Sequence, residues 1–229
     1  MSEPRISVVI PAFNRAHLVG DAIRSVLDQD RPADEIIVVD DGSTDETAAV
    51  AAAFPVRVVR QENRGIGGAR NRGIEESSGD LLAFLDSDDL WMPNRLSVQL
   101  RRLSEVPTVD MVFAHYREVH ERQGDQRVVP GVIAGWAAST LLARREVFER
   151  IGRFETDLRV GEFVSWCGRA REAGVPMAMV PEVLVTRRVH GGNIMGDRPD
   201  ALGDYARLLK ASLDRRRAAR GTGENGGKT

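Results

Sequence analysis

The chain has 229 residues, 42% of them apolar and 29% charged, an ordinary globular composition with enough length for a sizeable core. Its net charge of -2 at pH 7 excludes the broad basic surface that nucleic-acid binding would need. A single cysteine, Cys167, excludes an internal disulfide, and no stretch approaches a membrane span, so we expect a cytoplasmic protein that is not integral to a membrane.

Short apolar runs alternate with helical patterns through the first part of the chain. Helices are predicted at 19–27, at about 43–54 and after the glycine-rich stretch 62–73, with Ser43 and Glu46 at capping-box spacing. Buried strands are predicted at 6–10, 36–39, 56–60 and 81–85. This alternation predicts an α/β fold with a doubly wound, mostly parallel sheet.

Carboxylates follow two of these strands directly. Asp40 and Asp41 end the second strand, and Asp86, Asp88 and Asp89 follow the fourth. Because ligands of open α/β sheets bind at the carboxyl ends of the strands, the two groups are expected to share one ligand site. Carboxylate oxygens suit a hard divalent cation, and a cation in such a crevice favours a ligand that carries phosphate.

The glycine-rich stretch does not match the common nucleotide motifs. Arg70 stands where G-x-G-x-x-G requires its third glycine, and no lysine follows as in a P-loop. A nicotinamide or P-loop site is therefore disfavoured. The glycines, the helix that follows, and the side chains of Arg64 and Arg70 still suit a phosphate group.

The second part of the chain has a less regular pattern and no linker that would divide it. Helices are predicted from Pro93 onward, at 144–151 with Gly152 ending it, at 161–173 and at 199–220. Strands are predicted at 110–119, 127–133, 177–180 and 183–189. We expect one domain over 1–220 and a disordered tail at 221–229.

Four motifs, in order and correctly spaced, resemble the signature of the family 2 glycosyltransferases. They are SVVIPAFN at 7–14, VVDDGSTD at 38–45, the stretch 63–71 and FLDSDD at 84–89. Members of that family are inverting, metal-dependent enzymes with the so-called A-type fold. The resemblance therefore implies a Rossmann-like half at 5–105 that binds a nucleotide-sugar. It also implies an acceptor-side half at 106–198 and a C-terminal helix at 199–220.

The same resemblance implies roles for individual residues. Asp41 is expected to hydrogen-bond the base, usually uracil, which makes UDP the expected nucleotide. Asp88, in the D-x-D motif, is the implied ligand of Mn²⁺ or Mg²⁺, and His190 is a second ligand or a loop histidine with one hydrogen bond. The residues implied to contact the donor are Pro11, Ala12, Phe13, Asn14, Asp41, Arg64, Arg70, Asp86 and Ser87.

The family's catalytic base usually stands in a Glu-Asp pair that opens a later helix. Here Glu162 is present and Phe163 replaces the aspartate, which leaves Glu162 as the expected base. Asp157 and Glu155 are the alternatives.

The departure at Phe163 also leaves open a catalytically impaired protein that binds a nucleotide-sugar or acts as a scaffold. A nucleotidyltransferase is a further alternative, although residues 11–14 lack its usual glycine- and lysine-rich loop.

The acceptor hydroxyl could belong to a glycan, a lipid, a peptide or a small metabolite, and the sequence does not select among them. Trp91 and Trp136 are candidates for stacking an acceptor ring, with core packing as the alternative. The run Arg215-Arg216-Arg217 is expected to be a solvated helix end, with weak contact to an acidic membrane surface as its alternative.

Overall fold

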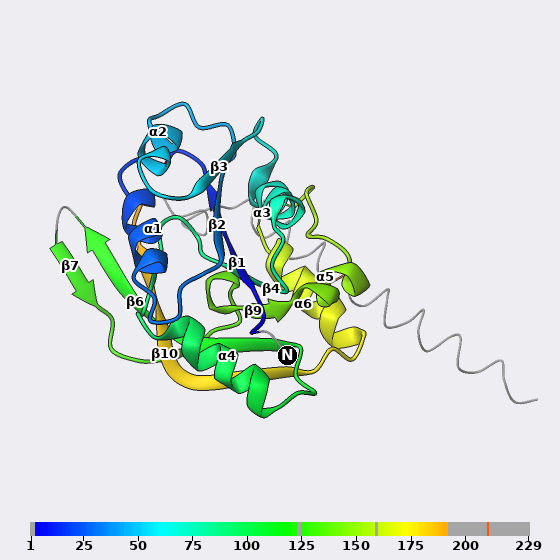
Figure 1. Cartoon of the computed structure of the whole chain (residues 1–229). Helices are drawn as coiled ribbons and strands as arrows, with labels where there is room; N and C mark the ends of the chain where they lie inside the picture. Colours follow the sequence, from blue (N-terminus) through cyan, green and yellow to red (C-terminus); the bar gives the residue numbers. More distant parts are fainter. Residues whose placement is uncertain (1–2, 123–124, 159, 192–209, 211–229) are drawn as a thin grey trace, which may run out of the picture.

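The computed structural model describes residues 3–122, 125–158, 160–191 and 210, which form one mixed sheet flanked by helices (Figure 1). The predicted helix at 199–220, the run 215–217 and the predicted tail at 221–229 therefore lie outside the described residues, apart from position 210. The strands are β1 (Ile6–Ala12), β2 (Glu35–Asp40), β3 (Arg57–Arg60), β4 (Leu81–Phe84), β5 (Leu90–Trp91), β6 (Met111–Arg122), β7 (Asp125–Val128), β8 (Ile133–Ala134), β9 (Leu142–Arg144) and β10 (Met177–Val189). The helices are α1 (Val19–Leu27), α2 (Thr47–Ala52), α3 (Gly65–Glu76), α4 (Arg95–Glu105), α5 (Arg145–Ile151), α6 (Glu162–Glu172) and the 3-10 turn η1 (Ala138–Thr140).

The sheet has the order β3-β2-β1-β4-β9-β6-β10-β5. Strands β1 to β4 pair in parallel, with Val8 opposite both Ile36 and Ala83, and β6 pairs in parallel with β10. The antiparallel pairings involve the short strands β5, β7, β8 and β9. The predicted α/β fold with a mostly parallel sheet is confirmed, with these short antiparallel strands added.

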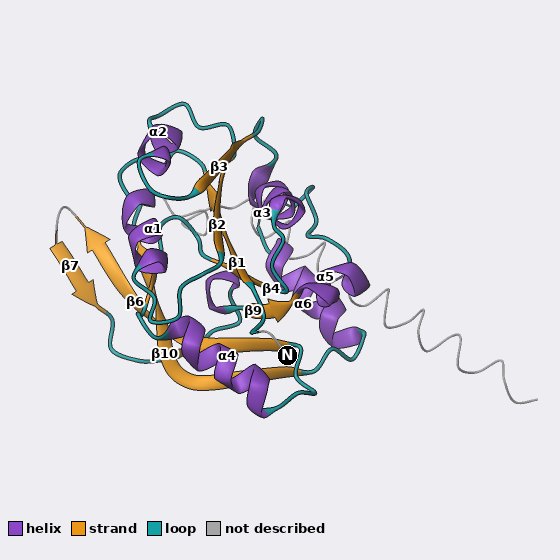
Figure 2. Ribbon diagram, in the orientation of Figure 1, coloured by secondary structure: helices purple, strands orange, loops and turns teal. Residues whose placement is uncertain are grey.

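Alternate residues of each central strand point to opposite faces, and each face has its own apolar core. Val8 and Ile10 pack under α1 and α4, whereas Val9 and Phe84 pack under α3, α5 and α6. Figure 2 shows α1 and α2 on one side of the central strands and α3, α5 and α6 on the other. No helix in the described ranges is both long and apolar enough to cross a membrane.

Two predicted strand boundaries were wrong, and backbone chemistry explains both. The predicted break near residue 181 is instead a register irregularity inside β10, where Pro181 has no N–H to donate. The predicted strand at 127–133 is divided between β7 and β8, because Pro130 and Gly131, which has φ 126°, interrupt it.

Helix starts differ from prediction as well. The Ser43 hydroxyl accepts the N–H of Asn14 at 2.9 Å instead of capping a helix, so the predicted capping box is wrong. Helix α2 begins at Thr47, whose N–H donates to Oδ1 of Asp45 at 3.0 Å. Most of the glycine stretch predicted as loop is helix, because α3 already begins at Gly65.

The glycines of α3 allow it to lie unusually close to its neighbours. A Cβ on Gly73 would overlap the side chain of Val9 in β1, and one on Gly67 would overlap the carbonyl of Glu155. Both contacts set how deeply α3 sits, and therefore where its Arg70 side chain lies.

We predict that Gly73→Ala destabilises the fold by about 1–3 kcal/mol in urea unfolding, because the added methyl group overpacks the interface with β1. Gly168→Ala is the matched control, since Gly168 also lies inside a helix and a Cβ there meets nothing within 4 Å. The control should gain about 0.5–1 kcal/mol through helix propensity. Equal effects of the two substitutions would mean that α3 does not press on β1.

Candidate active site

The loops after β1 and β2 are bonded to each other at the carboxyl end of the sheet. Asn14, the one described non-glycine residue with positive φ (51°), accepts the N–H of Thr44 on its side-chain oxygen at 2.9 Å. The N–H of Arg15 donates to the Thr47 hydroxyl at 2.7 Å. These bonds make the two loops one rigid wall.

Asp41, the first residue after β2, is buried, and its N–H donates to the Ala12 carbonyl at 2.8 Å. Its Oδ1 accepts the side-chain amide of Gln61 at 2.7 Å and the N–H of Arg64 at 2.9 Å. Burial raises the pKa of the carboxyl group above its usual value in spite of these bonds. Among the other residues implied for the donor, Pro11 and Ala12 are buried at the end of β1, whereas Phe13 is 43% exposed and Arg64 is exposed.

Asp89 is turned inward and anchors the acidic loop after β4. The Ser139 hydroxyl donates to Oδ2 of Asp89 at 2.8 Å and accepts the N–H of Asp86 at 3.1 Å. Burial, followed by the nearby charges of Asp86 and Asp88, raises the pKa of Asp89 well above its usual value. Ser87, which stands between Asp86 and Asp88, is buried too.

Arg188 holds the same loop from the other side. Its backbone N–H donates to Oδ1 of Asp89 at 3.3 Å, and its Nε donates to the carbonyl of Asp88 at 2.6 Å. Its guanidinium also pairs with Asp21 of α1 at 3.2 Å. Sequence reasoning missed Arg188 and Ser139, because neither stands in a recognisable motif.

The two predicted metal ligands are brought together. Oδ2 of Asp88 lies 3.3 Å from Nε2 of His190 and 3.5 Å from Nε of Arg15. Among the described residues, no three His, Cys, Asp or Glu side chains gather closely enough to hold a cation by themselves. A carboxylate next to an imidazole fits Mn²⁺ whose remaining ligands come from phosphate and water, so the donor set is compatible with the predicted cofactor.

Arg70 joins the two halves of the site. It is 2% exposed, and its guanidinium pairs with Oδ1 of Asp86 at 2.6 Å and with Oε1 of Glu162. The two carboxylates raise the pKa of Arg70 against the opposing effect of burial, so it stays charged. The resemblance implied that Arg70 lies near the donor, and in the structure it lies between Asp86, which is implied to contact the donor, and Glu162, the expected base.

Glu162 and Phe163 point in different directions from the start of α6. Gly161, with φ 84°, precedes the helix, and Glu162 is 5% exposed against Arg70. Phe163 instead packs among aromatic rings, 6.2 Å from Phe154 and 6.4 Å from Phe113 between ring centroids. The residue that departs from the family pattern therefore belongs to the core.

The alternative bases are differently placed. Oε1 of Glu155 accepts a hydrogen bond from the Ser165 hydroxyl at 2.8 Å and pairs with Arg169. Both partners belong to α6, so Glu155 holds the preceding segment against this helix. Asp157 is exposed.

The two tryptophans differ as well. Trp91 is buried, and its Nε1–H donates to the Ser139 carbonyl at 3.0 Å, so it belongs to the core. Trp136 is exposed.

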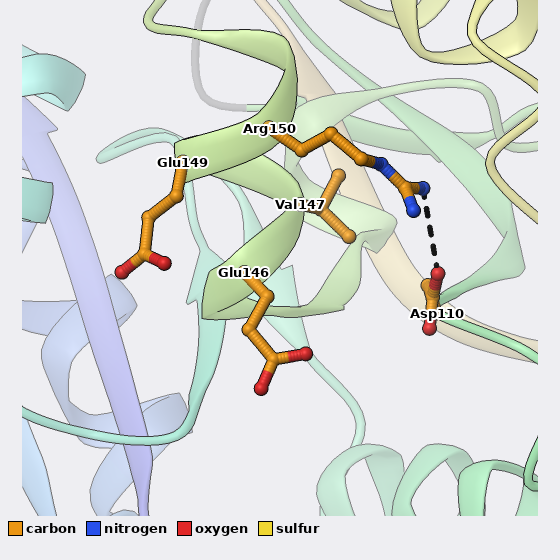
Figure 3. Close-up of a pocket in the computed structure, with 5 residues that line it drawn as sticks. All are labelled: Asp110, Glu146, Val147, Glu149 and Arg150. Carbon is orange, nitrogen blue, oxygen red and sulfur yellow. Dashed lines mark ion pairs between the residues drawn. The ribbon is translucent and has the colours of Figure 1, made fainter.

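A hollow of about 400 Å³ is lined by none of these groups. Figure 3 shows the residues that line it. Arg144, which precedes α5, pairs with Leu81 at the start of β4, so this hollow is at the amino end of that strand, opposite the acidic loop. Arg150 closes it by pairing with Asp110 at 3.5 Å. It is lined by Asp110, Glu146, Val147, Glu149 and Arg150. It does not contribute to the site described above.

Comparisons with known proteins agree on one family. The sequence model described as Glycosyl transferase family 2 matches residues 7–165. An uncharacterised glycosyltransferase of Rickettsia typhi is 29% identical over 92% of this chain and 72% of its own length. Succinoglycan biosynthesis protein ExoO of Rhizobium meliloti is 32% identical over 92% of this chain and 70% of its own.

Other relatives are matched over shorter stretches. The putative teichuronic acid biosynthesis glycosyltransferase TuaG of Bacillus subtilis is 39% identical over 45% of this chain and 43% of its own. The chain spans only 21% of a second Rickettsia glycosyltransferase, from Rickettsia conorii.

Among solved structures, S. aureus TarS (1–349) in complex with UDP-GlcNAc superposes with a TM-score of 0.77. The sequences are 20% identical, and the match covers 91% of this chain and 65% of that one. At this identity the likeness shows a shared fold.

We predict that Arg70 and Glu162 are strongly coupled in stability. Arg70→Met alone should cost about 3–5 kcal/mol, because it leaves a buried carboxylate without its cation. Adding Glu162→Gln should recover a large part of that loss in urea unfolding.

The exposed pair Arg101–Glu105 on α4, 3.9 Å apart, is the matched control and should couple by about 0.3–0.5 kcal/mol. Additive losses from Arg70→Met and Glu162→Gln would contradict the assigned contact.

Proposed function

The chain belongs to the family 2 glycosyltransferases, and we propose that it transfers a sugar with inversion from a UDP-sugar to a hydroxyl group of an acceptor glycan. One observation carries this proposal: Arg70 holds Asp86, at the end of β4, and Glu162, at the start of α6, against the same guanidinium. Direct displacement needs a donor and an acceptor at one point, and a single base next to the acceptor.

The nucleotide is assigned to the wall formed by the loops after β1 and β2. Asp41 would accept a hydrogen bond from the uracil ring, and Phe13 would cover the base from the rim. Hydrogen bonds between the loops, such as that from the Asn14 N–H to the Ser43 hydroxyl, mean that little order has to be gained when the nucleotide binds. TarS, which shares this fold, was solved with UDP-GlcNAc, and this supports a UDP-sugar as the donor.

The diphosphate is assigned to the acidic loop and its basic neighbours. Asp88 and His190 would hold Mn²⁺ or Mg²⁺, a cation that neutralises the negative charge of a diphosphate leaving group when bound. Arg15, 3.5 Å from Asp88, adds a fixed positive charge at the same place. Asp89, through Ser139 and Arg188, keeps the loop in one conformation.

Glu162 is assigned as the catalytic base. Its carboxylate takes the proton of the acceptor hydroxyl, and the acceptor oxygen forms a bond to the anomeric carbon. The bond from that carbon to the diphosphate oxygen breaks, and the electron pair leaves with UDP. Arg70 orients Glu162, and because Phe163 packs in the core, one carboxylate performs this role.

A glycan is the acceptor class that the relatives favour. ExoO is named for succinoglycan biosynthesis and TuaG for teichuronic acid biosynthesis, and both names refer to polysaccharides. The catalytically impaired alternative has less support, because Glu162 pairs with Arg70 next to Asp86 in spite of the departure at Phe163.

We predict that UDP binding depends on the cation through Asp88. In calorimetry with Mn²⁺, Asp88→Ala should weaken UDP binding by at least about tenfold, since one contact to a charged group contributes about 1.5–3 kcal/mol. Wild-type protein in EDTA should bind UDP as weakly as the variant does. Equal affinity of the two proteins in Mn²⁺ would remove Asp88 from the cation site.

We predict that Glu162→Gln lowers turnover by about 10²–10⁴-fold, because glutamine keeps the shape and accepts from Arg70 but cannot take a proton. The readout is UDP release from UDP-GlcNAc and UDP-glucose, with UDP affinity unchanged. Asp157→Asn, at the exposed alternative, should keep full activity. The opposite ranking of these two variants would move the base to Asp157.

A further inference from the structure

Trp136 is the one exposed tryptophan of the chain. It is 54% exposed, whereas Trp91 and Trp166 are 4% and 0% exposed. A tryptophan ring joins a large apolar face to one N–H donor, which suits it to a surface that binds a ligand in water.

The ring is held rigidly. It packs on Phe113 with ring centroids 4.6 Å apart, and the N–H of Trp136 donates to the carbonyl of Ala134 at 3.2 Å. The Thr140 hydroxyl donates to the carbonyl groups of Gly135 and Ala137, which closes the backbone around this position. A Cβ on Gly135 would overlap the Ala114 carbonyl, so the backbone at Gly135 is closely packed against β6.

The same segment leads directly to the candidate active site. Three residues after Trp136, Ser139 bonds both Asp86 and Asp89 in the acidic loop. Phe113, which supports the ring, also contacts Phe163, the neighbour of Glu162. Trp136 is therefore an exposed ring on a segment that contacts both the acidic loop, through Ser139, and the aromatic cluster beside Glu162, through Phe113.

We propose that Trp136 binds the acceptor by stacking on the apolar C–H face of a pyranose ring next to the hydroxyl group that reacts. The inference rests on the proposed function and adds a subsite to it. A pyranose presents a flat C–H face and polar edges, which fits one aromatic ring beside carboxylates. An acyl chain would instead need a continuous apolar trough. The exposed Val132 and Ile133 lie just upstream in the chain, so a lipid acceptor is an outcome that the test must separate.

The test is saturation-transfer NMR with UDP and Mn²⁺ present, using three separate probes: cellohexaose, chitohexaose and farnesyl phosphate. We expect at least one oligosaccharide to bind wild-type protein. Trp136→Ala should weaken that binding by about 3- to 10-fold, and Trp136→Phe should recover part of it. Val132→Ala, which truncates an equally exposed apolar side chain in the same segment, should bind like wild type.

Three results would overturn the proposal: unchanged oligosaccharide binding in Trp136→Ala, binding of farnesyl phosphate alone, or binding of none of the three probes. UDP calorimetry on the same samples separates this proposal from the proposed function. If Trp136→Ala lost UDP binding while wild-type protein kept it, the ring would belong to the donor site, and the acceptor subsite would also be overturned. Failure of wild-type protein to bind UDP would contradict the proposed function itself.

Discussion

The buried guanidinium of Arg70 is the constraint on which the rest of the site depends. A buried cation is costly unless carboxylates compensate it, and Asp86 and Glu162 do so from two distant parts of the chain. Arg70 reaches them because the glycines of α3 let the helix settle against β1 and the segment at Glu155. The packing of one helix thus fixes the position of the guanidinium that joins Asp86 to Glu162.

A second buried network fixes the acidic loop in the same way. Ser139 and Arg188 approach Asp89 from opposite sides, so the loop is held by η1 and by β10 together. Asp89 is buried, and its pKa is raised by this burial and by the nearby charges of Asp86 and Asp88. Asp86 and Asp88 instead pair with basic side chains, Asp86 with Arg70, and Asp88 with Arg15 and His190.

Local patterns predicted the strands and most helices, because apolar periodicity depends only on residues a few positions apart. The end of α5 at Gly152 is set locally in the same way, since this glycine adopts a positive φ. The strand pattern also predicted that Asp41 and Asp88 lie at the same end of the sheet, since each follows a parallel strand. The contacts that organise the site could not be predicted, because Arg70 and Glu162 are 92 residues apart and Arg188 and Asp88 are 100 apart. The capping box at Ser43 failed for the same reason, since a distant N–H, that of Asn14, took its hydroxyl.

One carboxylate, that of Glu162 held by Arg70, is assigned as the base of a direct displacement. Time-resolved proton NMR of UDP-GlcNAc and UDP-glucose in Mn²⁺, with water as the acceptor, tests this claim most directly. Because both donors are α-linked, inversion predicts that the β-anomer of the free sugar forms first and mutarotates afterwards. The α-anomer as the first product would contradict the account, since retention requires chemistry that a single base does not provide.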